Sequence, residues 1–472
     1  MVCIGNITQE FLSSIKLPDS LGIKLRYLIV NPYKEENKYA FPAGLGAVAS
    51  ALKVSGREVY TLNLDIYDEP LEKLKEDLHN KKINVLMVGG FSVEFSPIRD
   101  IIYAAKNLVP DLIVAVGGGL ISADPETAME ALEIADYGMI GEGEITVNAL
   151  AYALEHDEDA TLLPGIIGMR AGKWVANTDF PEIKNLDCIP YPDYEGFEFG
   201  TIIRGDNYSN KWTKRMGSNR IVYMNISRSC PFLCTFCFHT CGNHYRSMSM
   251  DAIFKYIDWI LQLYPEVEAL SFDGELTFSN EKFAEEFCKR IAPYKLKWRA
   301  NTRADVITEK MLRCMKESGC VSIMFGIESA CDSILKSMKK RITIEQIERA
   351  FECANRVDIY ARGTLIFGDP EETTETLNKT IEWYLTNRKW NDTDNFWNIT
   401  LGLIKAYPGT ALYKDACAKG LIKDKVQFLK DGCPPFNMSK LSDEEYSELP
   451  GLIQRLYCYG RNAEEQCVQK GC

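Results

Sequence analysis

The amino-acid sequence predicts an α/β protein: a doubly wound, Rossmann-like domain followed by a partial (β/α)6 barrel and a mainly helical C-terminal tail. Short apolar runs alternate with segments of helical period over residues 24–155, and a second series of this kind covers residues 221–410. A polar stretch that is rich in proline separates the two series. We therefore predict the first domain at residues 1–155, a linker at 156–220, the barrel at 221–410 and a helical region at 411–472.

The composition fits several globular domains and limits the possible partners. With 472 residues, of which 46% are hydrophobic, the chain can form two or three complete cores. Its 54 basic and 66 acidic residues give a net charge of −12 without a basic block, which argues against nucleic acid or an anionic membrane as the main partner. No apolar run approaches the length of a membrane span. Residues 1–22 show no secretory signal, and 16 cysteines in such a chain predict a reducing, cytoplasmic location.

The first series consists of five βα repeats, an order that implies a parallel sheet with helices on both faces. In such sheets ligands bind beyond the carboxyl ends of the strands. Of the four loops considered at these strand ends, three contain glycine. The glycine either lets a bulky ligand approach the backbone closely or simply makes a tight turn. The predicted strands are residues 25–30, 58–64, 83–88, 112–116 and 137–140, and the predicted helices are residues 43–54, 70–79, 97–108, 125–132 and 145–155.

A cysteine-rich loop follows the first strand of the second series, which is predicted at residues 221–226. Cys230, Cys234 and Cys237 offer three soft thiolates, and soft ligands select zinc or an iron–sulfur cluster. Three ligands are one short of closing either centre. An iron–sulfur cubane would keep one iron open to a substrate, whereas zinc would recruit a fourth ligand from His239, Cys241 or His244.

The C-x3-C-x2-C spacing of this loop, with Phe236 directly before the third cysteine, resembles the signature of the radical S-adenosylmethionine (SAM) superfamily. The resemblance implies a 4Fe-4S cluster on Cys230, Cys234 and Cys237, with SAM chelated to the open iron. One electron from the cluster would cleave SAM to a 5'-deoxyadenosyl radical, so an electron donor such as a ferredoxin or a flavodoxin is expected. The substrate is expected to be a small molecule or a peptide.

The loops after the next barrel strands resemble further motifs of that superfamily. Gly274 and Glu275 follow the second strand, where the family binds the ammonium group of SAM. Arg303 follows the third strand, where it could pair with the SAM carboxylate or lie on the barrel rim. Glu328 and Ser329 follow the fourth strand and resemble a ribose-binding segment, although Ser329 could also cap a helix.

The end of the fifth barrel strand matches the family's adenine-binding pattern in part. Ile366 and Gly368 fit the pattern, but its leading glycine falls at Gly363 instead of Thr364. The later barrel strands are predicted at residues 269–272, 297–300, 321–326, 360–367 and 396–404. The SAM contacts that the resemblance implies are Phe236, Gly274, Glu275, Arg303, Glu328, Ser329, Ile366 and Gly368.

The glycine-bearing loops of the first domain resemble the cobalamin-binding domain that precedes many radical SAM domains. The resemblance covers most of residues 24–155 and implies cobalamin as a third cofactor. Members that ligate cobalt through histidine carry Asp-x-His-x-x-Gly after the first strand, whereas Asn31-Pro32-Tyr33 stands there in this chain, so no protein histidine is expected on the cobalt. The implied contacts are Asn31, Tyr33, Gly44, Ser92, Gly117, Gly118, Gly119, Gly141, Glu142 and Glu144.

Both resemblances together imply a cobalamin-dependent radical SAM enzyme, and the expected activity is methyl transfer to an unactivated carbon. Three alternatives remain: oxidative cyclisation or rearrangement with cobalamin as an electron carrier, a radical SAM enzyme whose first domain binds no cobalamin, and a zinc- or corrinoid-binding sensor. The sequence identifies no catalytic residue. The tail cysteines lack a C-x2-C pair, which favours free thiols over a second cluster at Cys433, Cys458, Cys467 and Cys472.

Overall fold

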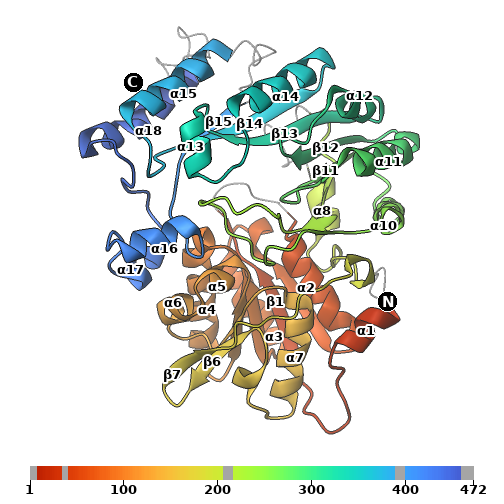
Figure 1. Ribbon diagram of the computed structural model, residues 1–472. Coiled ribbons are helices and arrows are strands. Elements are labelled where there is room, and N and C mark those ends of the chain that lie inside the picture. The colour runs from red at the N-terminus through yellow and green to blue at the C-terminus, as the bar shows by residue number, and fades with distance from the viewer. Residues whose placement is uncertain (1–7, 35–40, 206–215, 388–398, 459–472) are drawn as a thin grey trace. The chain divides into compact units, whose positions relative to one another are not determined.

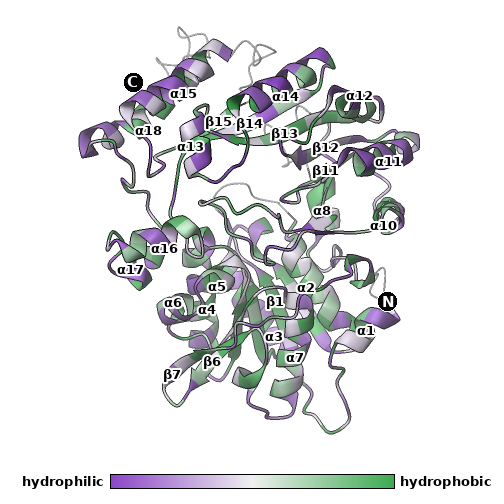
Figure 2. Cartoon of the chain, viewed as in Figure 1, coloured by the Kyte–Doolittle hydropathy of each residue, from purple (hydrophilic) through white to green (hydrophobic). Residues whose placement is uncertain are grey.

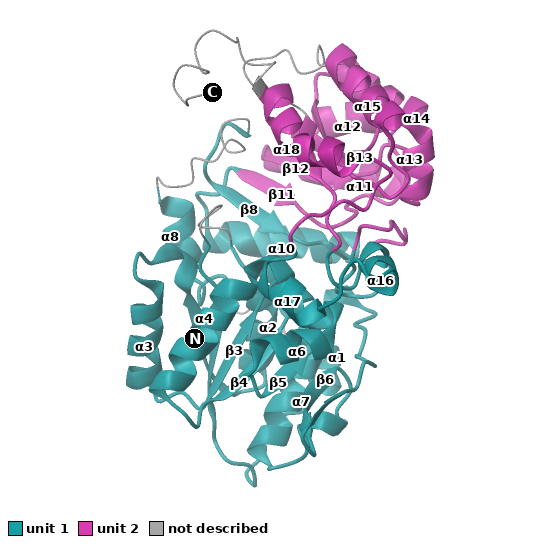
Figure 3. Ribbon diagram, turned by 90° about the vertical axis from the view of Figure 1, so that its left-hand side faces the viewer, with its two compact units in different colours: residues 1–229, 238–268, 407–433 teal, residues 230–237, 269–406, 434–472 magenta. Residues whose placement is uncertain are grey.

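The structure, a computed structural model, describes residues 8–34, 41–205, 216–387 and 399–458. The chain divides into two compact units, which are coloured separately in Figure 3. Unit 1 comprises residues 1–229, 238–268 and 407–433, and unit 2 comprises residues 230–237, 269–406 and 434–472. Each unit therefore takes residues from three separate stretches of sequence, and the cysteine-rich loop belongs to unit 2.

Unit 1 contains a seven-stranded sheet in the order β2-β1-β3-β4-β5-β6-β7. Strands β1, β6 and β7 of this sheet are labelled in Figure 1. The first five strands are parallel, and β6 and β7 continue the sheet in antiparallel pairing. The order 2-1-3 reverses direction between β1 and β3, which makes the carboxyl ends of these two strands the switch point where such sheets bind ligands. The strands are β1 (Arg26–Asn31), β2 (Glu58–Asn63), β3 (Val85–Gly89), β4 (Ile113–Gly117), β5 (Tyr137–Met139), β6 (Ile166–Arg170) and β7 (Lys173–Ala176).

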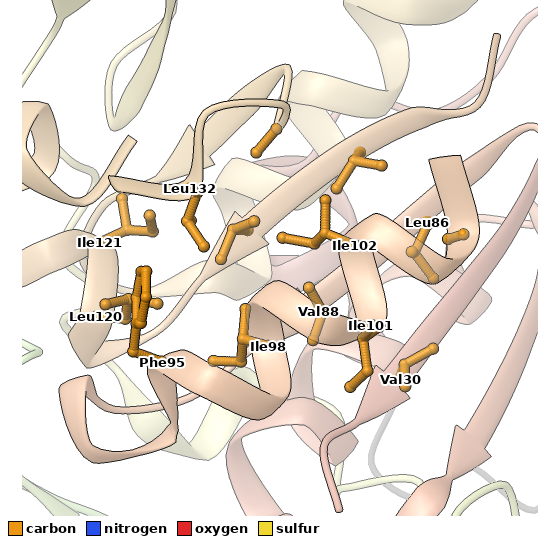
Figure 4. Packing of buried hydrophobic residues seen from close by; sticks show 14 of the residues in the cluster. Val30, Leu86, Val88, Phe95, Ile98, Ile101, Ile102, Leu120, Ile121 and Leu132 are labelled. Carbon is orange, nitrogen blue, oxygen red and sulfur yellow. The ribbon is translucent and has the colours of Figure 1, made fainter. Parts of the chain in front are cut away.

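The helices of this sheet begin where the chain offers start signals. Proline stands at the first position of α3 and of α6, where its fixed φ suits a helix and its missing N–H group is not needed. Buried side chains from α4 and α6 pack on the strands in one apolar core, of which Figure 4 shows Val88, Phe95, Ile98 and Leu132. The helices are α2 (Ala43–Val54), α3 (Pro70–Lys81), α4 (Phe95–Leu108), α5 (Gly119–Ala123), α6 (Pro125–Leu132) and α7 (Gly143–Glu155).

Most of the predicted linker packs within unit 1. Strands β6 and β7 lie in it, although the sequence analysis assigns no strand there, because these short strands alternate only partly and expose several side chains. Further along, Asp193 forms an ion pair with Lys53 of α2 at 2.6 Å, and the Tyr194 ring stacks on Phe41 at 4.1 Å between centroids. The segment after residue 160 therefore extends the first sheet and covers α2.

Other parts of unit 1 come from before and after the segment that forms the seven-stranded sheet. One helix, α1 (Gln9–Ser14), precedes it, and the later elements are α8 (Phe199–Arg204), β8 (Ile221–Met224), β9 (Ser227–Arg228), β10 (Arg246–Ser247), α10 (Met250–Leu263), α16 (Ala411–Ala418) and α17 (Lys425–Lys430). Strands β9 and β10 pair antiparallel and flank the cysteine-rich loop in sequence. Ser249 caps the N-terminus of α10, where its hydroxyl accepts a hydrogen bond from the N–H of Ala252.

Unit 2 contains five adjacent parallel strands in the order β15-β14-β13-β12-β11. Aromatic side chains fill the space between one face of these strands and the helices, as in the edge-to-face contacts of Phe287 on α11 with Phe272 (5.1 Å) and Trp298 (5.3 Å). The elements are β11 (Ala269–Phe272), α11 (Glu281–Ile291), β12 (Lys297–Thr302), α12 (Glu309–Glu317), β13 (Cys320–Glu328), α13 (Asp332–Ser337), α14 (Ile344–Arg356), β14 (Tyr360–Phe367), α15 (Thr374–Asn387), β15 (Ile399–Leu403) and α18 (Asp443–Cys458).

The predicted fold class is confirmed: a Rossmann-like first domain, a second parallel α/β region and a helical C-terminal region are all present. All eleven strands that the sequence predicts occur, with ends that shift by up to two residues within the described ranges, and residues 396–398 of the last predicted strand lie outside those ranges. Figure 2 shows the strands of the first sheet as largely hydrophobic, whereas α11 is mostly hydrophilic on its visible side. Across the described ranges, every helix lacks the length or the apolar content that crossing a bilayer requires.

Candidate functional site

The three cysteines of the predicted cluster lie on one loop of unit 2, and none of them forms a disulfide. The loop is fixed by its backbone: the N–H of Thr235 donates to the Met338 carbonyl (3.0 Å), and the N–H of Cys237 donates to the Cys234 carbonyl (3.1 Å). Within the described ranges, no three His, Cys, Asp or Glu side chains gather as they would around one metal ion. A 4Fe-4S cluster makes no such demand, because each cysteine binds a different iron atom.

The thiols of this loop lie among charged side chains. Burial raises the pKa of Cys230 and Cys234, and it raises the pKa of Cys237 to about 12. Next in weight, Lys340 and Arg303 lower the pKa of Cys234, which favours its thiolate form. Nearby cations that stabilise thiolates suit an anionic iron–sulfur cluster, so these residues fit the group that the sequence predicts.

Arg303 holds the cysteine loop from the side. Its guanidinium lies 3.6 Å from the centroid of the Phe232 ring, a cation–π contact. The same group forms a fork with Asp305 (2.9 and 3.2 Å) and donates to the Lys340 carbonyl (2.9 Å). Since these contacts use several of its donors, Arg303 positions the loop. Its contact with the SAM carboxylate stays a prediction.

Glu328 and Ser329 lie at the carboxyl end of β13, where the sequence analysis places the ribose contacts. Glu328 has a positive φ of 63° and forms an ion pair of 2.8 Å with Lys340, whose ammonium also lies 5.9 Å from the centroid of the Phe236 ring. Ser329 accepts a hydrogen bond from the N–H of Cys331 (3.1 Å), and it does not cap α13, whose N-cap residue is Cys331. The alternative role of Ser329 as a helix cap is therefore wrong.

The remaining predicted SAM contacts lie at the ends of β11 and β14. Gly274 is buried and Glu275 is exposed, and the Glu275 charge raises the pKa of both Cys230 and Cys237, after burial. Ile366 is half-buried and pairs in register with Gly402, beside which a side chain would meet nothing within 4 Å. This open space next to an apolar side chain suits a flat purine ring.

Glu372 provides a prediction about stability. Its carboxylate accepts a hydrogen bond from the N–H of Gly368 (2.5 Å), and burial raises its pKa from 4.5 to about 7. A carboxyl group whose pKa is raised by folding stabilises the folded state while it is protonated. Its contribution to the free energy of unfolding is therefore complete below pH 4.5 and is lost as the pH rises through 7. In the wild-type protein this effect should lower the free energy of unfolding by ~3 kcal/mol between the two ends of that pH range. We expect this decrease to be absent in Glu372→Gln, as measured by urea denaturation at both pH values. An unchanged pH dependence in the variant would contradict this assignment.

The switch point of the first sheet carries three of the predicted cobalamin contacts. Asn31 is buried and donates from its amide to the Asn63 side chain (2.7 Å), while the Tyr33 hydroxyl lies 3.4 Å from Asp100. Ser92 follows β3 and is buried, but Phe91 beside it is 61% exposed. An exposed aromatic ring at this edge fits a broad, partly apolar ligand such as a corrin. Residues 35–40, which follow β1, lie outside the described residues.

The glycines of this domain differ in how much space lies beside them. A Cβ atom at Gly118, whose φ is +82°, would lie 2.7 Å from the Gly90 carbonyl, so this glycine serves close packing of the two loops. Gly119 packs on Phe91 in the same way, and Gly141 packs on Phe180. Gly44 faces open space, and Gly117 meets only ordinary contacts. Close packing therefore explains Gly118, Gly119 and Gly141, whereas the approach of a ligand at Gly44 and Gly117 stays a prediction.

Glu142 and Glu144, two further predicted cobalamin contacts, belong to a buried ion-pair network within unit 1. Arg228 on β9 pairs with Glu142 (3.0 Å) and with Glu144, and Arg246 on β10 pairs with Glu142 (2.5 Å) and Glu182 (3.3 Å). Burial raises the pKa of Glu142, and burial also opposes the positive charge of Arg228, but Glu144 and Glu142 together raise the pKa of Arg228. Both carboxylates therefore already have protein partners.

Comparison with known proteins decides the family. The family model of the radical SAM superfamily matches residues 224–384, and that of the B12 binding domain matches residues 37–151. The chain is a radical SAM protein with a B12-binding domain. The cofactor predictions are confirmed at this level, since a 4Fe-4S cluster, SAM and cobalamin are the cofactors of these two domains.

Two of the curated relatives carry different names. The chain is 32% identical over 325 residues to an uncharacterized methyltransferase of Pyrococcus horikoshii, covering 67% of this chain and 66% of the relative. It is 28% identical over 368 residues to an anaerobic magnesium-protoporphyrin IX monomethyl ester cyclase of Cereibacter sphaeroides, covering 74% and 58%. The chain thus spans less than two thirds of the length of either relative.

The fold is shared with a solved structure. A radical SAM methyltransferase, TsrM, from Kitasatospora setae, with cobalamin and a 4Fe-4S cluster bound, is similar with a TM-score of 0.65. The similarity covers 84% of this chain and 75% of that protein at 18% sequence identity, so it shows the fold alone. It agrees with the two-domain α/β architecture that the sequence predicts.

Sequence reasoning missed several charged residues near the predicted sites. Lys340 lies between α13 and α14, outside the predicted motifs, and the fold brings it to Phe236 and Glu328. Arg362 could have been predicted from the sequence, because it lies four residues before Ile366 on β14. Residues an even number of positions apart point to the same face of a strand. Of the tail cysteines, Cys433 is buried, and the side chains of Cys458, Cys467 and Cys472 lie outside the described residues.

Proposed function

We propose that this radical SAM enzyme is a cobalamin-dependent methyltransferase that acts on an unactivated carbon of a small-molecule or peptide substrate. The observation that carries the proposal is that one chain contains both a loop of three unpaired cysteines, in unit 2, and a doubly wound sheet with a switch point, in unit 1. The methyltransferase name of the Pyrococcus horikoshii relative supports it.

The bound cofactors would divide the work: the reduced cluster with SAM supplies a radical that removes a substrate hydrogen atom, and cobalamin supplies the methyl group. The residues of this chain would bind and orient these groups. Cys230, Cys234 and Cys237 would hold the cluster on a loop that Arg303 fixes through Phe232. Lys340, by its charge near Cys234, favours the thiolate that binds iron.

SAM would bind at the carboxyl ends of the unit 2 strands. Glu328 would accept hydrogen bonds from the ribose hydroxyls, and Ile366 would pack on the adenine beside the open space at Gly402. Gly274 and Glu275 would receive the ammonium group. In unit 1, the exposed Phe91 ring and the space beside Gly44 would face the corrin.

The electron donor would be a ferredoxin or a flavodoxin, because the cluster requires a low-potential electron. The protein would act in the cytoplasm, where 16 cysteines remain reduced.

The two products of SAM separate methyl transfer from its main alternative. Anaerobic protein with reconstituted cluster and cobalamin would be mixed with SAM and a strong reductant, and S-adenosylhomocysteine and 5'-deoxyadenosine would be measured by mass spectrometry. Methyl transfer predicts both products, with S-adenosylhomocysteine absent when cobalamin is left out. Formation of 5'-deoxyadenosine alone would contradict it.

The second candidate is oxidative cyclisation or rearrangement, in which cobalamin carries electrons. The similarity to the Cereibacter sphaeroides cyclase favours this candidate, and its signature in the same experiment is 5'-deoxyadenosine without S-adenosylhomocysteine.

A further inference from the structure

A short basic segment of unit 2 lies between α13 and α14. Residues 336–341 contain four cations and no acidic residue, whereas the whole chain has a net charge of −12. We call this segment the basic turn, and it begins in the last turn of α13 and ends before α14. A local excess of positive charge on an otherwise acidic protein attracts acidic partners.

Two contacts within unit 2 hold the basic turn against the cysteine-rich loop. The N–H of Thr235 on that loop donates to the Met338 carbonyl (3.0 Å). Arg303 donates to the Lys340 carbonyl (2.9 Å), and its guanidinium lies 3.6 Å from the centroid of the Phe232 ring on the loop. The basic turn is therefore a direct neighbour of the loop that is predicted to hold the cluster.

The four cations of the basic turn divide into one that is buried and three that are exposed. Lys340 is buried and pairs with Glu328 at 2.8 Å. Lys336, Lys339 and Arg341 are exposed, and none of them forms an ion pair with another residue that the structure describes. Each of these three side chains therefore presents its charge to water.

The backbone of the basic turn is strained at two of the exposed cations. Lys339 has a φ of 53° and Arg341 has a φ of 58°, in the left-handed region that glycine adopts most readily. A side chain in this region costs free energy, and such strain is often found at functional positions. Among the described residues, the ion pairs of the fold give no reason for basic side chains at these two positions.

An exposed apolar side chain lies on the cysteine-rich loop itself. Leu233 is 54% exposed and stands between Phe232 and Cys234. It precedes Thr235, which bonds the basic turn, by two residues. Protein interfaces typically combine an apolar centre with a polar, charged rim, and Leu233 and the exposed cations offer both.

We propose that Leu233 and the exposed cations of the basic turn form the docking surface for an acidic electron carrier that contains a flavin, a flavodoxin. This inference rests on the proposed function only in taking the cluster to receive its electron from a carrier protein. The cations would attract the acidic surface of the carrier, and Leu233 would contact the apolar edge of its flavin ring. The anionic flavin hydroquinone would give up one electron and no proton, and the oxidised cluster would accept that electron without a covalent bond forming or breaking.

The docking surface is tested by measuring the affinity of flavodoxin for the full chain with reconstituted cluster, by anaerobic biolayer interferometry. We expect binding to weaken as the salt concentration rises, because salt screens exposed charges. The triple variant Lys336→Glu, Lys339→Glu and Arg341→Glu should bind flavodoxin about tenfold more weakly or worse. Leu233→Ser should also weaken binding, but with an unchanged salt dependence, because it removes an apolar contact and no charge.

A second triple variant changes the net charge equally at another exposed place in unit 2. Lys282→Glu, Lys289→Glu and Lys295→Glu lie on α11 or shortly after it, and Lys295 also has a positive φ, of 55°. This control should keep the wild-type affinity. The iron content of every variant is measured, so that loss of the cluster is distinguished from loss of docking.

Equal affinity of the wild-type protein and the basic-turn variant at equal iron content would overturn the proposal. Failure of flavodoxin to bind the wild-type protein would do the same, as would tighter binding of a ferredoxin to this surface. The products of SAM are measured separately with a chemical reductant in place of the carrier. Absence of S-adenosylhomocysteine there would end the proposed function without bearing on the docking surface.

Discussion

Replacing Cys234 with alanine is expected to abolish cluster assembly and SAM cleavage together. Only Cys230 and Cys237 would remain on the loop, and two thiolates cannot hold the three irons that the cysteine motif serves. The variant should retain the fold of unit 2, because the loop's backbone bond from Thr235 to Met338 and the stacking of Arg303 on Phe232 do not use this side chain.

Iron and sulfide per chain, together with 5'-deoxyadenosine formed per chain, are the quantities to measure after anaerobic reconstitution. We expect less than about a tenth of the wild-type value for each, since the cluster binds as a unit. Cys314→Ala is the matched control, because this free cysteine lies on α12 away from the loop and should leave both values unchanged. Wild-type SAM cleavage in the Cys234 variant would contradict the radical mechanism.

The second large effect is expected at Arg228, whose removal takes an ion-pair partner from two buried carboxylates, of which Glu142 keeps Arg246. Glu142 is 2% exposed, Glu144 is 4% exposed, and both pair with Arg228. Breaking a buried ion pair on one side costs about 3–5 kcal/mol, because a charge then stays buried without compensation. Arg228→Met should therefore lower the unfolding free energy of unit 1 by about this amount, as measured by urea denaturation followed by circular dichroism.

Two comparisons make this result specific. Arg313→Met removes a more exposed partner of Glu309 and should cost less than about 1 kcal/mol. Adding Glu142→Gln and Glu144→Gln to Arg228→Met should recover part of the lost stability, because the uncompensated charges are then gone. A loss of under 1 kcal/mol in Arg228→Met alone would show that the network is not a structural element.

The network matters for function because of its place in the chain. Arg228 lies on β9 two residues before Cys230, and Arg246 lies opposite it on β10. Both arginines bind the turn between β5 and α7 at Glu142. The segments on either side of the cysteine loop are thus anchored to the domain that is predicted to bind cobalamin.

Local sequence signals predict much of the fold. The helix at residues 43–54 and the strand at residues 360–367 occur with the predicted ends, because the apolar pattern of each is bounded by clear stop signals. Strands β6 and β7 were not predicted, because they join the sheet by antiparallel pairing. The alternation of strands and helices that predicts the other strands gives no sign of such pairing. A hairpin of two strands of five and four residues has too little periodicity to separate it from a connecting segment.

The site was predictable only where chemistry is concentrated in a short motif. Three cysteines within eight residues identify the cluster loop, whereas the partner of Glu142 lies 86 residues away at Arg228, and no local pattern connects the two. The contacts proposed for SAM and cobalamin stay predictions, residue by residue.

Retention of cobalamin tests the central claim most directly. Anaerobically purified protein with reconstituted cluster would be offered hydroxocobalamin and desalted, and the corrinoid that remains would be measured by absorbance. The proposed function predicts about one corrinoid per chain, held without a protein histidine on the cobalt. Protein that keeps its iron but retains no corrinoid would contradict the cobalamin-dependent methyltransferase and leave a radical SAM enzyme whose first domain serves another purpose.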